Sequence, residues 1–397
     1  MDEVELRWLL PDGRVGGALP DGTVVRADRG LPGDRVRFEV HGHQGRTLDA
    51  RVTERLVSSP DRRPAPCPWD AACGGCDLAE LTPSARPGVL ARMVARAFRT
   101  DLLPEVVSSP RGTAHRARIK LAIEGSRLGY RAARSHELVE IGRCGVAREE
   151  VQLAMSRVRD HLAALPPEHG LAAVELRSDG ARVVFALRSA TGEVPRSVRD
   201  GLATLGDVAL DGRRLHGDPN LTLAVDGVAL RASPNSFYQV NLEGNALLVE
   251  HVRTLATRVR AERAVDLYAG IGNLSLPLAA AGIPVVAVES EGQAVEDLRS
   301  ATGALPVQVL RTRVERFDPS RTAFDLAVLD PPRAGAPGVL ARLALNRPRA
   351  VVYVSCHAVS AARDLAELRG YRLTDLRCFD LFPDTRHVET VLMLERA

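Results

Sequence analysis

The feature that most constrains the fold is a regular alternation of strand-like and helix-like segments through residues 229–397. Apolar runs such as RAVDLYAG, IPVVAVES, FDLAVLDPP and RAVVYVSC are separated by stretches in which apolar residues follow helical spacing. Strands that alternate with helices predict a parallel, doubly wound α/β sheet. The last two strand-like runs, YRLTDLRCFDLF and HVETVLMLER, have no helix between them. We therefore expect an antiparallel hairpin to close the edge of this sheet.

The rest of the chain divides into two further parts, because 397 residues are too many for one ordinary hydrophobic core. Residues 1–58 hold short alternating stretches separated by glycine-rich turns, which is typical of a small antiparallel barrel of the OB type. Residues 59–228 contain a helix-spaced segment between Pro87 and Leu103 and several strand-like, arginine-rich stretches. This pattern predicts a mixed α+β domain, so we expect three domains: 1–58, 59–228 and 229–397.

Composition narrows the class of protein without naming a function. The hydrophobic content of 45% and charged content of 26% are those of an ordinary globular chain. The absence of an apolar leader and of a run of roughly 18 apolar residues argues against secretion and membrane spanning, so we expect a cytoplasmic protein. The net charge of +3 does not identify a partner. Six arginines of the first part are compatible with either nucleic-acid binding or a solvated surface: Arg14, Arg26, Arg35, Arg37, Arg46 and Arg51.

The segment VDLYAGIGNLSLPLA is a strand, a glycine turn and the start of a helix. Gly270 and Gly272 allow the backbone to turn tightly and to approach a ligand at the helix N-terminus. The next strand ends at Glu289, where a carboxylate can accept hydrogen bonds from both hydroxyls of a ribose. A dinucleotide site needs a third glycine beside the pyrophosphate, but here the turn continues with Asn273. We therefore favour S-adenosylmethionine, which carries no phosphate, over NAD.

A cysteine follows the fifth strand of this sheet, in the segment AVVYVSCH (350–357). Cysteine often serves only as a small buried hydrophobic residue. Cys356, however, lies at the carboxyl-end rim where such sheets bind ligands, beside Asp330 and its rigid Pro-Pro shelf. Near a methyl donor, a thiolate can add to C6 of uracil and make C5 nucleophilic. Glu389, at the start of the last strand, is the candidate base for the C5 proton. A Cys–His hydrolase using His357 is disfavoured because consecutive side chains diverge.

Taken together, these segments resemble the uracil-C5 RNA methyltransferases, which make 5-methyluridine in tRNA and 23S ribosomal RNA. The resemblance rests on FYQVN (237–241), DLYAGIGNLSLPLA (266–279), DPPR (330–333), SC (355–356) and HVE (387–389), in the family's order. It implies a Rossmann-like class I methyltransferase sheet, with Cys356 as nucleophile and Glu389 as proton acceptor. It also implies contacts to S-adenosylmethionine from five residues: Gln239, Tyr268, Asn273, Glu289 and Asp330.

Other features refine the resemblance. The first domain resembles a TRAM domain, best matched by GLPGDRVRFEV. After the nucleophilic cysteine the family usually has Asn-Pro, whereas this chain has His357-Ala358. This departure bears on how the catalytic base is positioned. The following segment ARDL (362–365) again matches the family's pattern. Cytosine-C5 RNA methyltransferases carry a second cysteine in the DPP region, and none is present here, which favours uracil. Phe237 and Tyr238 suit either stacking on a base or ordinary core packing.

The central domain contains a second cysteine pattern. Cys67, Cys73 and Cys76 are closely spaced, and Cys144 follows far downstream. Four thiolates suit either zinc or an iron–sulfur cluster, although structural zinc more often shows two short paired spacings. The ribosomal-RNA branch of the family resembles this pattern and binds a [4Fe-4S] cluster, which implies a structural cluster here, with zinc as the alternative. Cys378, in a strand-like run, is expected to be core.

The sequence therefore predicts a monomeric enzyme that methylates C5 of a uridine in RNA. We expect this uridine to be flipped out of its stack, which gives access to C5. The resemblance favours 23S ribosomal RNA as substrate, with tRNA as the alternative. An NAD-dependent oxidoreductase remains as a rival because of the glycine turn and Glu289, but it leaves Cys356 and Glu389 unexplained. A catalytically inert RNA-binding module is a second rival, motivated by His357.

Overall fold

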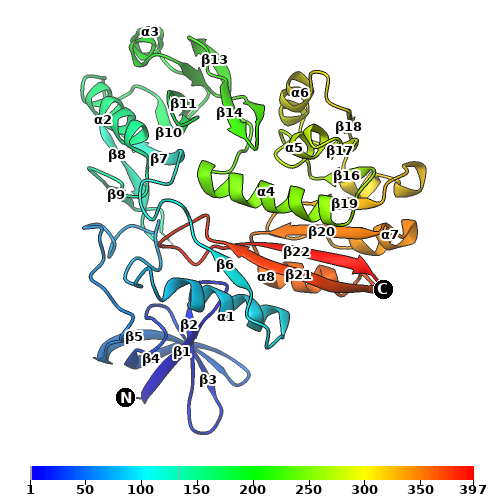
Figure 1. Cartoon of the computed structure of the whole chain (residues 1–397). Coiled ribbons are helices and arrows are strands. Elements are labelled where there is room, and N and C mark those ends of the chain that lie inside the picture. Colours follow the sequence, from blue (N-terminus) through cyan, green and yellow to red (C-terminus); the bar gives the residue numbers. More distant parts are fainter. Residues whose placement is uncertain (1, 134) are drawn as a thin grey trace.

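The computed structural model describes residues 2–133 and 135–397, which form three sheet-based parts: in Figure 1 the barrel lies at the lower left, the central sheet at the upper left and the C-terminal sheet at the right. A small barrel lies at the N-terminal end, a seven-stranded sheet forms the middle of the chain, and an eight-stranded sheet contains the C-terminus. Within the described residues, no helix is long and apolar enough to span a bilayer.

The predicted N-terminal barrel is present, with strands closing in the order β1-β2-β3-β5-β4, but it is not wholly antiparallel because β3 and β5 pair parallel. Its strands are β1 (Asp2–Leu9), β2 (Val15–Ala18), β3 (Val24–Ala27), β4 (Arg35–Gln44) and β5 (Thr47–Val57). Alternate side chains, such as Leu6, Val25 and Phe38, point inward and fill the barrel. Four of its six candidate RNA-binding arginines instead pair with barrel carboxylates: Arg14 and Arg26 with Asp49, Arg35 with Glu3, and Arg37 with Glu54.

The central sheet has the order β13-β12-β11-β10-β7-β8-β9 and is mixed α+β, as predicted. Its strands are β7 (Arg118–Glu124), β8 (Arg127–Arg131), β9 (Leu138–Glu140), β10 (Leu171–Ser178), β11 (Val183–Ser189), β12 (Val208–Leu210) and β13 (Arg213–His216). Helix α2 (Glu149–Ala163) buries Val151, Met155 and Val158, spaced on one helical face, against this sheet. Helix α3 (Arg196–Leu202) and the hairpin β14 (Leu221–Val225) to β15 (Val228–Ala232) complete the region.

The C-terminal sheet has the order β18-β17-β16-β19-β20-β22-β21-β6, and its first five strands are parallel, as predicted. The eight strands of the sheet are β16 (Ala264–Leu267), β17 (Val285–Glu289), β18 (Val307–Arg311), β19 (Leu326–Leu329), β20 (Ala350–Ser355), β21 (Tyr371–Phe379), β22 (Glu389–Arg396) and β6 (Glu105–Val107). Side chains of β20 alternate between two cores: Val352 and Val354 pack on one face, Val351 and Tyr353 on the other. The sheet is therefore doubly wound.

Helices cover both faces of this sheet. Helices α4 (Leu242–Arg258), α5 (Ser275–Ala280) and α6 (Gly292–Ala301) pack on one face, and α7 (Val339–Asn346) and α8 (Ala358–Leu365) pack on the other. Helix α1 (Arg86–Phe98) bridges the barrel to this second side, where its Leu90 and Val94 join a core shared with barrel residues (Figure 1). It ends where Arg99 adopts a left-handed conformation, with φ of 52°.

The predicted hairpin at the C-terminus is present, but the expectation that it closes the sheet edge is wrong. Strands β21 and β22 pair antiparallel, and β22 also pairs with β20. The edge is closed by β6, which runs parallel to β21 and comes from the central region of the sequence. A three-residue strand, Glu105–Val107, is too short to show an alternating pattern, so the sequence holds little signal for it.

Candidate functional site

The glycine turn after β16 is built as its sequence requires. Gly270 and Gly272 have φ of 55° and 96°, in the left-handed region that glycine adopts without cost. A Cβ on Gly272 would lie 2.5 Å from Cδ1 of Leu298 in α6, so a side chain at this position would collide with the helix. Tyr268 also has a positive φ of 65°, which is strained for a residue with a side chain. Strain of this kind is concentrated at binding sites.

Glu289, the last residue of β17, fastens this turn to the neighbouring strand. One of its carboxylate oxygens accepts a hydrogen bond from Gly270 N at 2.9 Å, and the other accepts from the backbone N–H groups of Ser290 and Glu291 at 2.6 and 2.8 Å. The carboxylate is therefore fixed beside the turn. Asp266, which sequence reasoning did not single out, lies buried beneath it, and burial raises its pKa to about 7.

Four of the five predicted cofactor residues line one cavity of about 470 Å³: Gln239, Tyr268, Asn273 and Asp330. Glu289 does not line this cavity but contacts its turn through Gly270. Asn273 is oriented by a reciprocal pair of amide hydrogen bonds with Asn245 of α4, at 2.7 and 3.0 Å. The cavity therefore gathers fixed polar groups around a backbone turn.

The predicted nucleophile and base line the same cavity. Cys356 follows β20, and Glu389 begins β22. These strands pair directly, with Ser355 opposite Thr390, which brings the two side chains to one rim. Asp330 reaches the rim from the end of β19. The structure thus brings together residues that lie up to 59 positions apart in sequence by this pairing of strand ends.

Burial and mutual repulsion raise the pKa values of this group of acids. Burial, reinforced by the charge of Asp330, raises the pKa of Glu389 to about 8, and Arg333 opposes the shift. Burial raises the pKa of Asp330 to about 6. The pKa of the Cys356 thiol rises to about 11, chiefly through burial and then through Glu389 and Asp330, again opposed by Arg333. At neutral pH the thiol and Glu389 both carry protons, and Glu389 becomes a base close to pH 8.

His357 explains the departure from the usual Asn-Pro sequence. It is the N-cap of α8: its Nδ1 accepts a hydrogen bond from Ser360 N at 3.3 Å and lies 2.8 Å from Ser360 Oγ. An asparagine oxygen at this position would serve the same purpose. Nδ1 of the His357 ring is thus occupied by the helix end.

The two aromatic residues of FYQVN differ in environment. Tyr238 is buried, donates its hydroxyl hydrogen bond to Ser178 O at 3.0 Å and packs in the core. Phe237 is 62% exposed at the cavity, with the guanidinium of Arg118 4.7 Å from its ring centre. Of the two alternatives, core packing therefore describes Tyr238, while Phe237 remains available for stacking.

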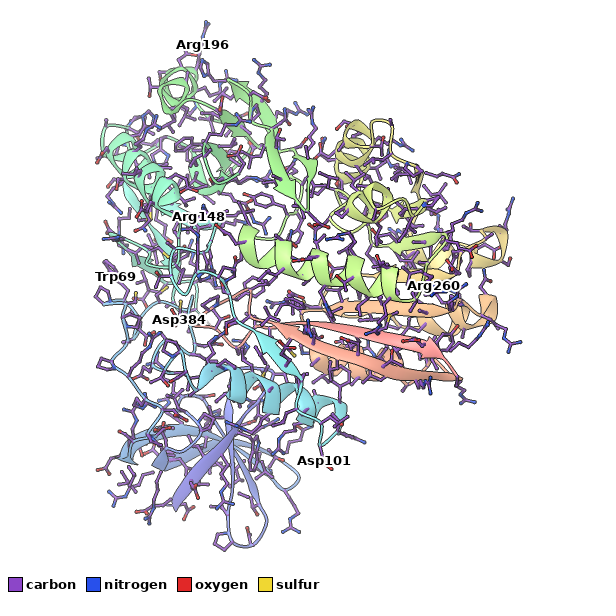
Figure 2. All side chains as sticks on the ribbon, in the orientation of Figure 1. Trp69, Asp101, Arg148, Arg196, Arg260 and Asp384 are labelled. Atoms are coloured by element: carbon purple, nitrogen blue, oxygen red, sulfur yellow. The ribbon has the colours of Figure 1, made fainter. Side chains whose placement is uncertain are left out.

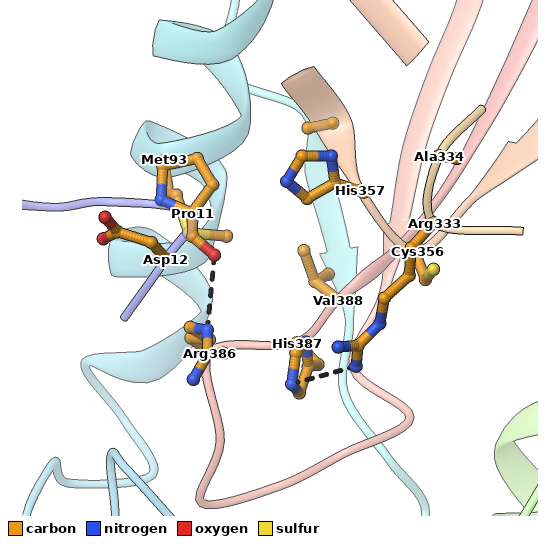
Figure 3. A pocket seen from close by; sticks show the side chains of 11 residues that line it. Pro11, Asp12, Met93, Arg333, Ala334, Cys356, His357, Arg386, His387 and Val388 are labelled. Atoms are coloured by element: carbon orange, nitrogen blue, oxygen red, sulfur yellow. Dashed lines mark hydrogen bonds between the residues drawn. The ribbon is translucent and has the colours of Figure 1, made fainter. Parts of the chain in front are cut away.

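A second cavity of about 330 Å³ lies against Cys356, and Figure 3 shows it. Pro11 and Asp12 of the barrel and Met93 of α1 form one wall, facing His357 and Cys356 (Figure 3). Arg333, Cys356 and His387 line both cavities. Sequence reasoning missed this cavity because its walls come from five separate regions of the chain.

The loop between β21 and β22, residues 380–388, is held by long-range ion pairs that sequence reasoning also missed. Buried Arg86 pairs with Asp380 and donates to the carbonyl oxygens of Phe382 and Thr385 at 3.0 and 2.6 Å. Arg63 pairs with Asp384 at 2.7 Å. Figure 2 shows Asp384 where the barrel and the central sheet meet. This loop forms part of both cavity walls, so these contacts fix the shape of the site.

The four predicted metal-ligating cysteines lie near one another. Burial raises the pKa of Cys73, with added repulsion from Cys144 and Cys67, and burial raises the pKa of Cys76 to about 12, with repulsion from Cys144 and Cys73. The hydroxyl of Tyr130 lies 3.6 Å from Cys144 Sγ. In residues 2–133 and 135–397, no three His, Cys, Asp or Glu side chains converge closely enough to hold a single metal ion. Cys378, in contrast, is fully buried core, as predicted.

Comparisons with known proteins place this arrangement among methyltransferases. The family model tRNA (Uracil-5-)-methyltransferase matches residues 301–397. The 23S rRNA (uracil(1939)-C(5))-methyltransferase RlmD of Chromohalobacter salexigens is 33% identical over 100% of this chain and 89% of its own length. The protein of that name from Pseudomonas putida is 31% identical over 99% and 93%. The structure of Pyrococcus abyssi tRNA (uracil-54, C5)-methyltransferase in complex with S-adenosyl-L-homocysteine is 25% identical, covers 99% of this chain and 100% of its own, and superposes with a TM-score of 0.81.

Proposed function

The chain belongs to the S-adenosylmethionine-dependent RNA uracil-C5 methyltransferases, and on that premise we propose that it methylates C5 of a uridine in 23S ribosomal RNA through a covalent bond to Cys356. The main support for this mechanism is that Cys356 and Glu389 line the same cavity as the glycine turn and its polar residues. The choice of 23S ribosomal RNA rests on relatives that match nearly the whole chain, and tRNA is the alternative because of the archaeal structure.

In this proposal the cofactor is held by Gln239, Tyr268, Asn273, Glu289 and Asp330. When bound, S-adenosylmethionine supplies an electrophilic methyl group. The Cys356 thiol gives up its proton to solvent, the thiolate adds to C6 of the uracil, and the electrons of the C5–C6 double bond move toward O4, so that C5 becomes a carbon nucleophile. After C5 has been methylated, Glu389 accepts the C5 proton. The electrons of that C–H bond restore the double bond and expel the Cys356 thiolate.

Incubation with methyl-labelled S-adenosylmethionine tests the substrate. We expect a 23S ribosomal RNA fragment containing uracil 1939 to be methylated at C5, at a rate at least about 100-fold above that of a tRNA transcript containing uridine 54. Mass spectrometry of the digested RNA would locate 5-methyluridine. The reverse preference would assign the enzyme to tRNA, and methylation of neither RNA would contradict the proposed function. Stabilisation by NAD but not by S-adenosylhomocysteine in thermal unfolding would favour the oxidoreductase alternative.

We further propose that Cys67, Cys73, Cys76 and Cys144 hold a [4Fe-4S] cluster with a structural role. The mutual repulsion of these thiols shows that they share one neighbourhood, and the thiolate-only donor set fits a cluster. Structural zinc more often shows two short paired cysteine spacings, whereas Cys144 stands far downstream of the other three cysteines. This spacing supports the cluster over zinc.

Metal analysis of protein purified without oxygen tests this cluster. We expect about four iron atoms and four sulfide ions per chain, with loss of both in Cys144→Ser and retention in the core control Cys378→Ala. Stoichiometric zinc without sulfide would contradict the cluster.

We also propose the division of the chain into domains 1–58, 59–228 and 229–397, and action as a monomer in the cytoplasm. One chain supplies every proposed nucleophile, base and cofactor contact, which supports a monomeric enzyme.

A further inference from the structure

We propose that the cavity of about 330 Å³ beside Cys356 is the subsite for the RNA nucleotide that flanks the target uridine. The inference rests on the proposed function and adds a second binding position, with a wall supplied by the N-terminal barrel. Four observations support it: the residues that the two cavities share, the groups that only the larger cavity contains, the chemistry of the walls, and an arginine at the junction for which the described residues supply no carboxylate partner.

The target base itself belongs in the larger cavity. It must contact Cys356 and Glu389 together, and Glu389 and Asp330 line only that cavity. The residues of the glycine turn, such as Gly270 and Asn273, also line only that cavity. The smaller cavity is therefore free when cofactor and target base are bound. Because the smaller cavity is also lined by Cys356, a nucleotide joined to the target uridine lies close enough to enter this cavity.

The walls of the smaller cavity suit one unstacked nucleobase. Met93, Ala358 and Val388 provide buried apolar surface, and Pro11 completes the barrel side (Figure 3). The volume is at the lower end of the range for small-ligand sites, which fits one nucleotide and excludes a base-paired helix. Single bases removed from their stack are the form in which proteins usually recognise RNA sequence.

Arg333 supplies the cation for the phosphate that joins the two nucleotides. Its exposed guanidinium lines both cavities and lies 3.3 Å from His387 Nε2. Among the described residues it forms no ion pair with a carboxylate, whereas neighbouring Arg386 pairs with Asp77. A guanidinium without a carboxylate at the mouth of a nucleotide cavity is suited to a phosphate. Burial, with nearby arginines, lowers the pKa of His357 and of His387, the latter to about 4, so both rings are neutral hydrogen-bonding groups at pH 7.

The location of the smaller cavity also gives the barrel a specific role in RNA recognition. Four of its six candidate arginines are neutralised by barrel carboxylates, so the barrel does not offer a broad basic face from these residues. Its loop between β1 and β2 instead lines the cavity beside the catalytic cysteine through Pro11 and Asp12. Arg386 ties the loop in place by donating from Nε to Pro11 O at 3.2 Å. The barrel therefore supplies part of the wall of the smaller cavity beside the active site.

The test pairs a cavity-filling variant with altered RNA. Ala334 is exposed and lines only the smaller cavity, so Ala334→Trp fills it from an unburied position. The RNAs are the 23S fragment with uracil 1939 and two copies, each with an abasic residue on one side of that uridine. For wild type, we expect one abasic RNA to lower kcat/KM about tenfold or more. For Ala334→Trp, we expect a similar loss on intact RNA and no further loss on that abasic RNA.

Two measurements separate this result from general damage. Ala334→Trp should keep its stabilisation by S-adenosylhomocysteine, and Ala190→Trp, an exposed alanine of the central domain, should behave as wild type with every RNA. The subsite would be overturned if the abasic RNA lowered kcat/KM of Ala334→Trp as much as it lowers that of wild type. It would also be overturned if Ala334→Trp methylated intact RNA as fast as wild type does. If neither abasic RNA is a poorer substrate for wild type, the subsite is also overturned, without reference to any variant. Failure of the proposed function differs, because wild type would then methylate none of these RNAs.

Discussion

Replacement of Cys356 by alanine is expected to lower RNA methylation by more than about 1,000-fold, because C5 of uracil becomes nucleophilic only after sulfur has added to C6. The same variant should form no covalent adduct with RNA that carries 5-fluorouridine at the target. Fluorine at C5 leaves no proton for Glu389 to accept, so wild-type enzyme should remain bonded to that RNA. The adduct is measured as a band resistant to denaturing electrophoresis and by mass spectrometry of the cysteine peptide.

Cys378→Ala is the matched control for this experiment. Cys378 is fully buried in the core that joins the barrel, α1 and the C-terminal sheet, away from both cavities. Its loss should leave a small void that costs about 1 kcal/mol of stability, with methylation and adduct formation close to wild type. Retention of more than a tenth of wild-type methylation by Cys356→Ala, or an adduct through another residue, would contradict the proposed nucleophile.

The site could be predicted where its residues carry local signals. The glycine turn at Gly270 and Gly272 follows a strand and precedes a helix, and Cys356 follows a strongly apolar strand. In a parallel sheet both positions are directed to the same rim, so their meeting in one cavity follows from periodicity and connectivity. The doubly wound core was predictable for the same reason.

Other parts depend on contacts that leave no local pattern. Arg86 and Asp380 are 294 positions apart, and nothing in the neighbourhood of either residue indicates that they pair across the site. The edge strand β6 is three residues long, and Pro11 lines the cavity beside the thiol only because the barrel docks on α1. Long-range pairing of this kind depends on the docking of whole domains, which sequence spacing does not encode.

Glu389→Gln is expected to slow turnover by about 100- to 10,000-fold while leaving the enzyme bonded to ordinary RNA. Sulfur addition does not use the carboxylate, whereas expulsion of sulfur requires a base for the C5 proton. The substitution also removes one of the charges that raise the pKa of Cys356, so adduct formation should not suffer. The expected product is a methylated RNA–enzyme adduct, identified by its mass. Glu395→Gln, on the same strand but away from both cavities, should turn over normally.

The pH dependence distinguishes this role from a merely structural one. The pKa of Glu389 is about 8 in the folded protein, above the ordinary 4.5, so the folded state holds this proton more tightly than the unfolded chain does. Stability therefore falls as pH rises from about 4.5 to 8 and is then constant with respect to this group. Glu389→Gln lacks that loss, and we expect it to be at least about 1 kcal/mol more stable than wild type at pH 8.5 and equal to it near pH 4.

Wild-type methylation should rise through pH 8 as Glu389 ionises, and the residual activity of Glu389→Gln should not. Equal unfolding curves at pH 8.5, together with a wild-type rate that is flat through pH 8, would show that Glu389 neither carries the raised pKa nor acts as the base.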